Sequence, residues 1–435
     1  MASRLYSYVV LAITFVTMTL MIGNSTLFNF TVICMKPEDR GQNWVNETRF
    51  YTPGEEGWLI GITTVGLIIA TLPVIRMTDR IGMRHSFPVF GVISAVSTIA
   101  FAPLAGDIYS AGFAIASTFL AIGNVPIDHG GVDGKALFLS LLSCSYQFGP
   151  LLSIPLSAAF CSSPIGWKGV NYLFGSVTLL SFALFFIIYR NGTETTRSQS
   201  TAKVLPKERV NTLNDTPPYR AILTNASVWG IINNGIGDSM AFMVFFFYGP
   251  IYVNKVLHFE VEQAGILAAL PYLVSIIVKL IAGVFLHHTT YASSPRTVYW
   301  ANIFLQGLLT LNFLVLIFFT SGRPILAEAL IVATMGITGL HFLAMLSAAQ
   351  IIAKQYTHVI SSAMAAIESC FGLILPPFVS FLAPHHTAEE WTRVFYCVTG
   401  FLVVTNVLFS VLTKVKPAEW TKEDYNNESN ELKST

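Results

Sequence analysis

Long apolar stretches separated by short polar segments run along the whole chain of 435 residues. Each stretch is about 20 residues long, the length that a helix needs to cross the hydrocarbon core of a bilayer. Six lie before residue 190 and six after residue 220: Tyr8–Val32, Gly57–Val74, Phe87–Pro103, Ala111–Pro126, Ala136–Phe160, Val170–Tyr189, Val228–Val253, Ile266–Leu286, Val298–Thr320, Ile325–Ile352, Val359–Leu382 and Val394–Val411. The pattern predicts an all-α integral membrane fold with twelve transmembrane helices in two six-helix bundles.

The longest polar segment, Arg190–Arg220, divides the two sets of apolar stretches. Six of its residues are basic and three are acidic, and its last part contains Pro217-Pro218, which cannot continue a helix. We therefore expect a first bundle at residues 1–189, a cytoplasmic linker at 190–220, a second bundle at 221–414 and a cytoplasmic tail at 415–435.

Composition supports a membrane protein and excludes a water-soluble fold of this size. The chain is 53% hydrophobic and 11% charged, with a mean hydropathy of +0.60. The net charge is +1 and basic residues form no cluster, so no nucleic-acid partner is expected. The five cysteines lie in or beside apolar stretches, which favours small buried hydrophobes over a disulfide framework or a metal site. They are Cys34, Cys144, Cys161, Cys370 and Cys397.

The distribution of basic residues predicts the orientation in the bilayer. If both termini are cytoplasmic, the cytoplasmic segments hold 17 lysines and arginines and the outer loops hold 7. This bias favours cytoplasmic termini and a cytoplasmic linker. In that topology Asn46 is a glycosylation acceptor in the first outer loop, whereas the sequons at Asn24 and Asn29 fall inside the first helix and are expected to be silent.

A short segment between the second and third apolar stretches points to a family. Asp79-Arg80-Ile81-Gly82-Met83-Arg84 resembles the core of the cytoplasmic signature loop of the major facilitator transporters, with Asp79, Arg80, Gly82 and Arg84 at its defining positions. Ile75 replaces the leading glycine. The resemblance implies two bundles that rock about a site near the membrane midplane.

Further motifs narrow the resemblance to the family of sialin, the vesicular glutamate transporters and the sodium-phosphate cotransporters, of which this chain looks like a divergent member. The motifs are Trp58 with Gly61, Gly66 and Pro73, Tyr146–Gly149, Pro155–Ser157, Gly166–Gly175, Pro250–Tyr252, Val261–Gly265, Leu270–Leu273 and Glu389–Phe395. The resemblance implies a monomeric secondary transporter of small organic anions or phosphate, driven by protons, sodium or membrane potential, in the plasma membrane or an endolysosomal or vesicular membrane.

The chain departs from that family at its usual charged positions. No arginine occurs between Arg4 and Arg40 or between Arg84 and Arg190. By alignment with the family pattern, the fourth-helix arginine falls at Ser117, the nearby acidic residue at Asn124, and the seventh-helix histidine at Gly235. These departures leave the anion and coupling site to be sought elsewhere.

Ionisable residues inside apolar stretches are functional candidates, because charge at bilayer depth is costly. They are Asp238, Lys279, Glu328, His341 and Glu368. The family architecture implies that the first, fourth, seventh and tenth helices line the cavity, which favours Asp238 and His341. Among uncharged residues, Asn29 and Asn124 are candidates to line it as well.

Structural alternatives stand beside these functional ones. Asp238 can hydrogen-bond within its own helix to Asn233 or Asn234, and His341 can be a packed neutral histidine. Lys279 and Glu368 can form a buried structural ion pair.

For the two remaining polar candidates, the structural alternative is a role outside the cavity. Glu328 lies near the outer end of its helix and is expected to reach the interface. Asn29 serves equally well as a helix-to-helix hydrogen bond.

The function we infer is secondary transport, with protonation of Asp238 or Glu368 coupled to solute movement and Lys279 or His341 supplying positive charge. Two alternatives stay open: a non-transporting sensor or scaffold of transporter fold, and a transporter of neutral or cationic solutes. An enzyme is disfavoured, and no cofactor or metal is expected beyond a coupling H⁺ or Na⁺, because no nucleophile–base constellation, metal-ligand spacing or phosphate-binding loop occurs.

Overall fold

The computed structural model describes residues 2–37, 50–118, 142, 144–189, 218–288, 294–319 and 322–421. Its regular structure is helical throughout this part of the chain. The long helices are α1 (Ala2–Thr31), α2 (Pro53–Ile81), α3 (Met83–Leu104), α4 (Ile108–Thr118), α6 (Ser145–Cys161), α7 (Trp167–Ile188), α10 (Ala226–Ile251), α11 (Val261–His288), α12 (Pro295–Phe319), α13 (Pro324–Ala353), α14 (Thr357–Leu382) and α15 (Ala388–Leu412). Short helices are α9 (Tyr219–Thr224), η5 (Tyr252–Val256), η7 (Lys354–Tyr356) and η8 (Glu419–Thr421).

Each of the twelve predicted stretches overlaps one helix of the described residues. Nine of these helices are long and apolar enough to cross a membrane, and α2, α4 and α6 overlap the other three stretches. The fourth and fifth stretches are covered only in part, because residues 119–141 and 143 lie outside the described residues. The all-α membrane fold is therefore confirmed.

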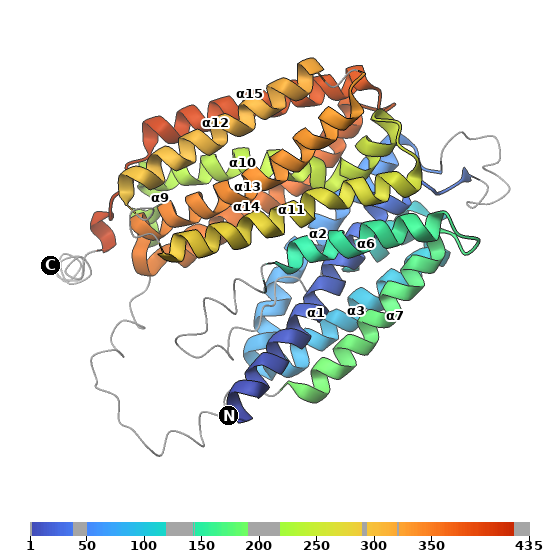
Figure 1. The fold of residues 1–435 in the computed structure, drawn as a ribbon. Helices are drawn as coiled ribbons and strands as arrows, with labels where there is room; N and C mark the ends of the chain where they lie inside the picture. Colours follow the sequence, from blue (N-terminus) through green and yellow to red (C-terminus); the bar gives the residue numbers. More distant parts are fainter. Residues whose placement is uncertain are drawn as a thin grey trace.

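The helices form two groups, α1 to α7 and α10 to α15, shown from blue to green and from yellow-green to red in Figure 1. We call the face at which α1 begins and α15 ends the termini face, and the other one the opposite face. The groups touch through α1 with α10, α2 with α14, and α6 with α11. The predicted linker boundary stays a prediction, because residues 190–217 lie outside the described part.

Contacts between the groups lie toward the opposite face. A Cβ on Gly57 of α2 would collide with Ser380 of α14, and a Cβ on Gly61 would lie 3.3 Å from the Leu373 carbonyl oxygen. The Glu56 carboxylate lies 3.4 Å from Nε2 of His386, which follows α14, and both side chains are buried. These contacts hold the two groups together at the opposite face.

The predicted signature loop is almost entirely helical. α2 continues through Arg80 to Ile81, and α3 begins at Met83, so only Gly82 lies between the helices. Gly82 has φ of 74°, a conformation that side-chain-bearing residues rarely adopt. Arg84 donates a hydrogen bond to the Phe186 carbonyl oxygen at 3.3 Å and so binds within the first group. The side chain of Asp79 lies outside the described residues.

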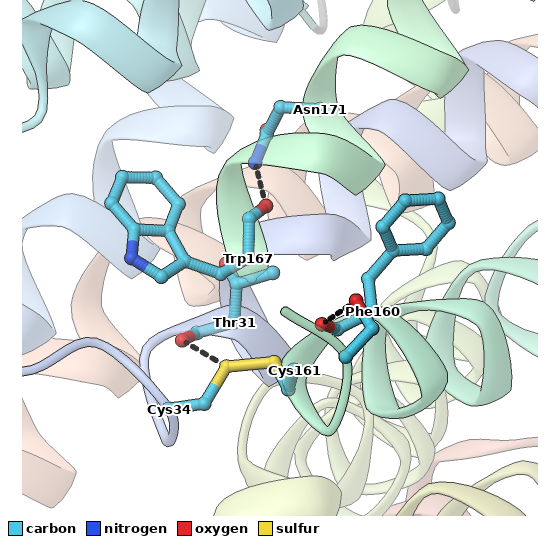
Figure 2. The surroundings of a disulfide bond; sticks show 7 residues. Thr31, Cys34, Phe160, Cys161, Trp167 and Asn171 are labelled. Atoms are coloured by element: carbon cyan, nitrogen blue, oxygen red, sulfur yellow. Dashed lines mark hydrogen bonds between the residues drawn. A yellow bond between two sulfur atoms is a disulfide. The ribbon is translucent and has the colours of Figure 1, made fainter. Parts of the chain in front are cut away.

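A disulfide joins Cys34 to Cys161, contrary to the prediction of free buried cysteines (Figure 2). Cys34 follows the end of α1 and Cys161 is the last residue of α6. These helices pack together and bring the two Cα atoms to 5.9 Å, within the range of a disulfide. Sequence spacing could not reveal the pair, because the partners are 127 residues apart. The crosslink fixes two neighbouring helices at the opposite face.

Candidate functional site

A cavity of about 160 Å³ lies between α10, α13 and α14. It lies on the termini-face side of the contacts that close the opposite face. Its walls are mainly apolar, with polar groups from two carboxylates and two serines. The lining includes Asp238 and Ser239 from α10, Phe342 and Met345 from α13, and Ser361, Met364 and Glu368 from α14. A small apolar cavity with a few converging polar groups is typical of a solute site.

Asp238 and His341, both predicted candidates, meet in this site. His341 Nδ1 lies 2.9 Å from Asp238 Oδ1, and His341 is fully buried. Asp238 is 7% exposed and borders the cavity, so the histidine lies behind the carboxylate rather than in the cavity wall. His341 is thus buried, as the alternative of a packed histidine expects. Its contact with a cavity carboxylate nevertheless makes it part of the site.

Two buried asparagines extend the Asp238–His341 contact into a chain of hydrogen bonds that leads away from the cavity. Asn234 Nδ2 lies 3.0 Å from His341 Nε2 and donates a second hydrogen bond to Asn302 Oδ1 at 3.0 Å. Asn302 Nδ2 in turn donates to the carbonyl oxygens of Val298 and Ala344 at 2.7 and 3.1 Å. The chain of contacts thus runs from the backbone of α12 and α13 to the cavity carboxylate.

The sequence analysis missed Asn302, because it considered mainly charged groups. A signal existed: α12 carries Asn302, Gln306 and Asn312 within an otherwise apolar stretch, and all three are buried. Asn234 was considered only as a partner of Asp238, and the structure gives it to His341 instead. An amide at bilayer depth, like a charge, needs a partner.

Lys279 approaches the site from α11. Its alkyl chain packs against Gly339 of α13, where an added Cβ would lie 3.3 Å from Lys279 Cε. Its ammonium lies 5.9 Å from the centre of the Phe342 ring, which lines the cavity. Lys279 interacts electrostatically with both Asp238 and Glu368. The Lys279 side chain therefore lies behind the cavity wall.

Glu368 is a half-buried residue of the cavity wall. The ion pairs found among the described residues do not include one between Glu368 and Lys279. The two groups interact over a longer range. Asp238 and Glu368 thus place two carboxylates in one cavity.

The glycines beside Asp238 allow close packing. α10 is continuous from Ala226 to Ile251, so Gly235 and Gly237 do not open the helix. A Cβ on Gly237 would collide with Gln306 and Thr405, and one on Gly235 would lie 3.2 Å from Met345 Sδ. The two glycines therefore let side chains of α12, α13 and α15 approach α10 closely.

Other predicted candidates lie away from the cavity. Asn29 donates a hydrogen bond to the Phe246 carbonyl oxygen at 3.3 Å, which makes it the helix-to-helix contact weighed above and joins the two groups. Glu328 is 5% exposed, so its side chain is buried in the protein. Asn46 and Asn124 lie outside the described residues, as does the side chain of Ser117.

Comparison with known proteins agrees with this architecture. A family model described as the Major Facilitator Superfamily matches residues 12–375. Human sialin is 24% identical over 388 residues, covering 85% of this chain and 77% of sialin. Mouse sodium-dependent phosphate transport protein 1 is 21% identical over 433 residues, covering 95% of this chain and 91% of that protein. The predicted resemblance is therefore confirmed at low identity.

Solved structures share the fold. An inward-facing, unoccupied bacterial homologue of the human lysosomal transporter Spinster has a TM-score of 0.69 at 12% identity, covering 94% of this chain and 97% of that one. A D-xylose-proton symporter has a TM-score of 0.67 at 12% identity, covering 94% and 99%. With the family model spanning most of its length, this multi-pass chain belongs to the Major Facilitator Superfamily of membrane transporters.

Proposed function

We propose that this transporter moves a small organic anion or phosphate together with protons, by alternating access. The observation that carries the proposal is the pair of carboxylates, Asp238 and Glu368, which line one cavity with Lys279 and His341 close behind. Two relatives are named for anions: the mouse sodium-dependent phosphate transport protein 1 and the vesicular glutamate transporter 1 of Xenopus tropicalis.

Electrostatics link the anion to a proton. Two ionised carboxylates in a largely apolar cavity repel an anion strongly, because the surroundings screen charge poorly. When one carboxylate takes up a proton, Lys279 balances the other and the cavity can accept a negative solute. Proton binding and anion binding then favour each other, which is the thermodynamic requirement for symport.

A transporter of cationic solutes is the second candidate. The same two carboxylates, in their ionised form, suit a positive solute, and the family's arginine positions in the first and fourth helices are unfilled. In that case protons compete with the solute instead of accompanying it. The two candidates therefore predict opposite effects of acid on the cavity side.

Uptake into proteoliposomes tests the proposal. Labelled inorganic phosphate, glutamate and small monocarboxylates would be offered with a pH gradient, with a sodium gradient, and with neither. We expect anion uptake that needs the pH gradient and falls by about 5- to 150-fold in Asp238→Asn, the range of a coupling free energy of 1–3 kcal/mol. Glu262→Gln, which alters an exposed carboxylate of α11, is the control.

Three outcomes would contradict it. Uptake driven by a sodium gradient alone would show that sodium, and not the proton, is the coupling ion. The name of the mouse relative refers to sodium dependence. Uptake of organic cations but of no anion would favour the second candidate. Folded protein that binds a solute without moving it would favour a sensor.

A further inference from the structure

The buried contacts behind Asp238 have a fixed direction. Asn302 uses both protons of its amide nitrogen on backbone carbonyl oxygens, those of Val298 and Ala344. A carbonyl oxygen only accepts hydrogen bonds, so the amide of Asn302 cannot turn around without losing both. Its Oδ1 must therefore face Asn234.

This orientation passes along the chain to His341. Asn302 Oδ1 accepts from Asn234 Nδ2, and the second proton of the same nitrogen points to His341 Nε2. Because Nε2 accepts, the proton of the neutral imidazole lies on Nδ1. Nδ1 then donates to Asp238 Oδ1.

The buried oxygen of Asn234 indicates that Asn302 fixes the orientation of the Asn234 amide. Asn234 Oδ1 is buried and has no hydrogen-bond partner among the described residues. A half-turn of the Asn234 amide would bring Oδ1 to His341 Nε2. There Oδ1 would accept a hydrogen bond if Nε2 carried the imidazole proton. The same rotation would place Asn234 Oδ1 against Asn302 Oδ1, two acceptors facing each other, which opposes it.

We propose that Asn302 and Asn234 are positioning residues of the transport site, which hold His341 as the Nδ1–H tautomer and leave the Asp238 carboxylate to bind the exchanged proton. The proton forms an O–H bond with Oδ2, the oxygen that His341 does not engage, and leaves from the same atom. The proposal deepens the proposed function and rests on it for the role of Asp238.

Other charged groups near Asp238 come from the elements around it. Glu368 on α14 faces the same cavity, and Lys279 on α11 interacts with both carboxylates. Neither contacts the imidazole in the hydrogen bonds of the described residues, so the tautomer of His341 is set from the side of α12. The effect of Asn302 is thereby separable from that of the neighbouring charges.

Nitrogen NMR of ¹⁵N-histidine-labelled protein in lipid bilayers tests the tautomer without any solute. The chain has nine histidines, and the signal of His341 is identified by its loss in His341→Gln. We expect the signal of His341 to be that of the neutral Nδ1–H tautomer, because Nε2 accepts from Asn234. In Asn302→Leu or Asn234→Leu, the signal should show the other tautomer or a titration.

The control is Asn312→Leu on the same helix, whose side chain bonds Leu330 and Thr334 instead. It should leave the His341 signal unchanged. A wild-type His341 that carries its proton on Nε2, or a proton on both nitrogens, would overturn the proposal. Because Asn302→Leu and Asn234→Leu break the same contact from two sides, one of them suffices if the other does not fold.

Transport supplies the second readout. With labelled phosphate and glutamate as probes, Asn302→Leu should shift the pH profile of uptake, but not in the His341→Gln background, where nothing titrates at position 341. An equal shift of the pH profile with and without His341→Gln would mean that Asn302 has a merely structural role. If the wild type carries neither these probes nor the small monocarboxylates under any gradient, the proposed function fails, whereas the NMR result still decides the tautomer.

Discussion

At the scale of single residues, the site consists of side chains that three different helices bring together. Asp238 and His341 stood out because an ionisable group inside an apolar stretch is rare. Their contact joins two helices about a hundred residues apart in sequence, and Asn302 comes from a third helix. Pairings of that kind depend on how helices rotate about their axes, which hydrophobic length does not specify.

Glu328 gives a prediction about stability. Its carboxylate is buried in α13, and neither oxygen has a hydrogen-bond partner among the described residues. Because burying an unsatisfied polar group costs about 1–3 kcal/mol, Glu328→Met should raise the stability of the purified protein by that order. Thermal unfolding in detergent measures it, with Glu262→Met on an exposed site as the control. Lower stability in Glu328→Met would show that the carboxyl has a favourable partner.

At the scale of elements, the closure at the opposite face depends on how near α2 can come to α14. Gly57 touches Ser380 so closely that a larger residue must separate the helices. The sequence predicted both helices but assigned Gly61 only to a family motif, because a glycine in a helix does not reveal which neighbour it faces. The contact itself appears only once the two groups are assembled.

Gly57→Val should therefore shift the protein away from the conformation closed at the opposite face. A cysteine placed at Ser361, in the cavity on the termini-face side, should react more slowly with a maleimide in Gly57→Val, after the three cysteines outside the disulfide, Cys144, Cys370 and Cys397, are replaced. Gly54→Val is the matched control, since a Cβ there meets nothing within 4 Å. Equal labelling in the two variants would contradict a gating role for this contact.

The Glu56–His386 contact belongs to the same closure. Glu56→Gln removes the carboxylate from this buried contact between the two groups, so it should weaken the state that is closed at the opposite face. The labelling rate at Ser361→Cys should then fall in Glu56→Gln, with Gly54→Val again as the control. An unchanged labelling rate would show that this contact does not hold the closure.

At the scale of the whole molecule, the fold followed from the sequence more completely than the site did. Helix number and order are encoded by apolar length, which the bilayer enforces directly. The sequence did not reveal the disulfide, because Cys34 and Cys161 become neighbours only when α1 packs on α6. The same disulfide bears on orientation, because such bonds persist in oxidising compartments.

The opposite face should accordingly be extracellular or luminal, and the termini should be cytoplasmic, as the bias of basic residues also predicts. In right-side-out vesicles, an impermeant phosphine reductant followed by an impermeant maleimide should label Cys34 and Cys161, while a tag at the C-terminus stays protected until the membrane is opened. Cys34→Ser with Cys161→Ser is the control for background labelling. Labelling of this pair only in inside-out vesicles would reverse the orientation and place the cavity side, with Asp238 and Glu368, toward the oxidising compartment.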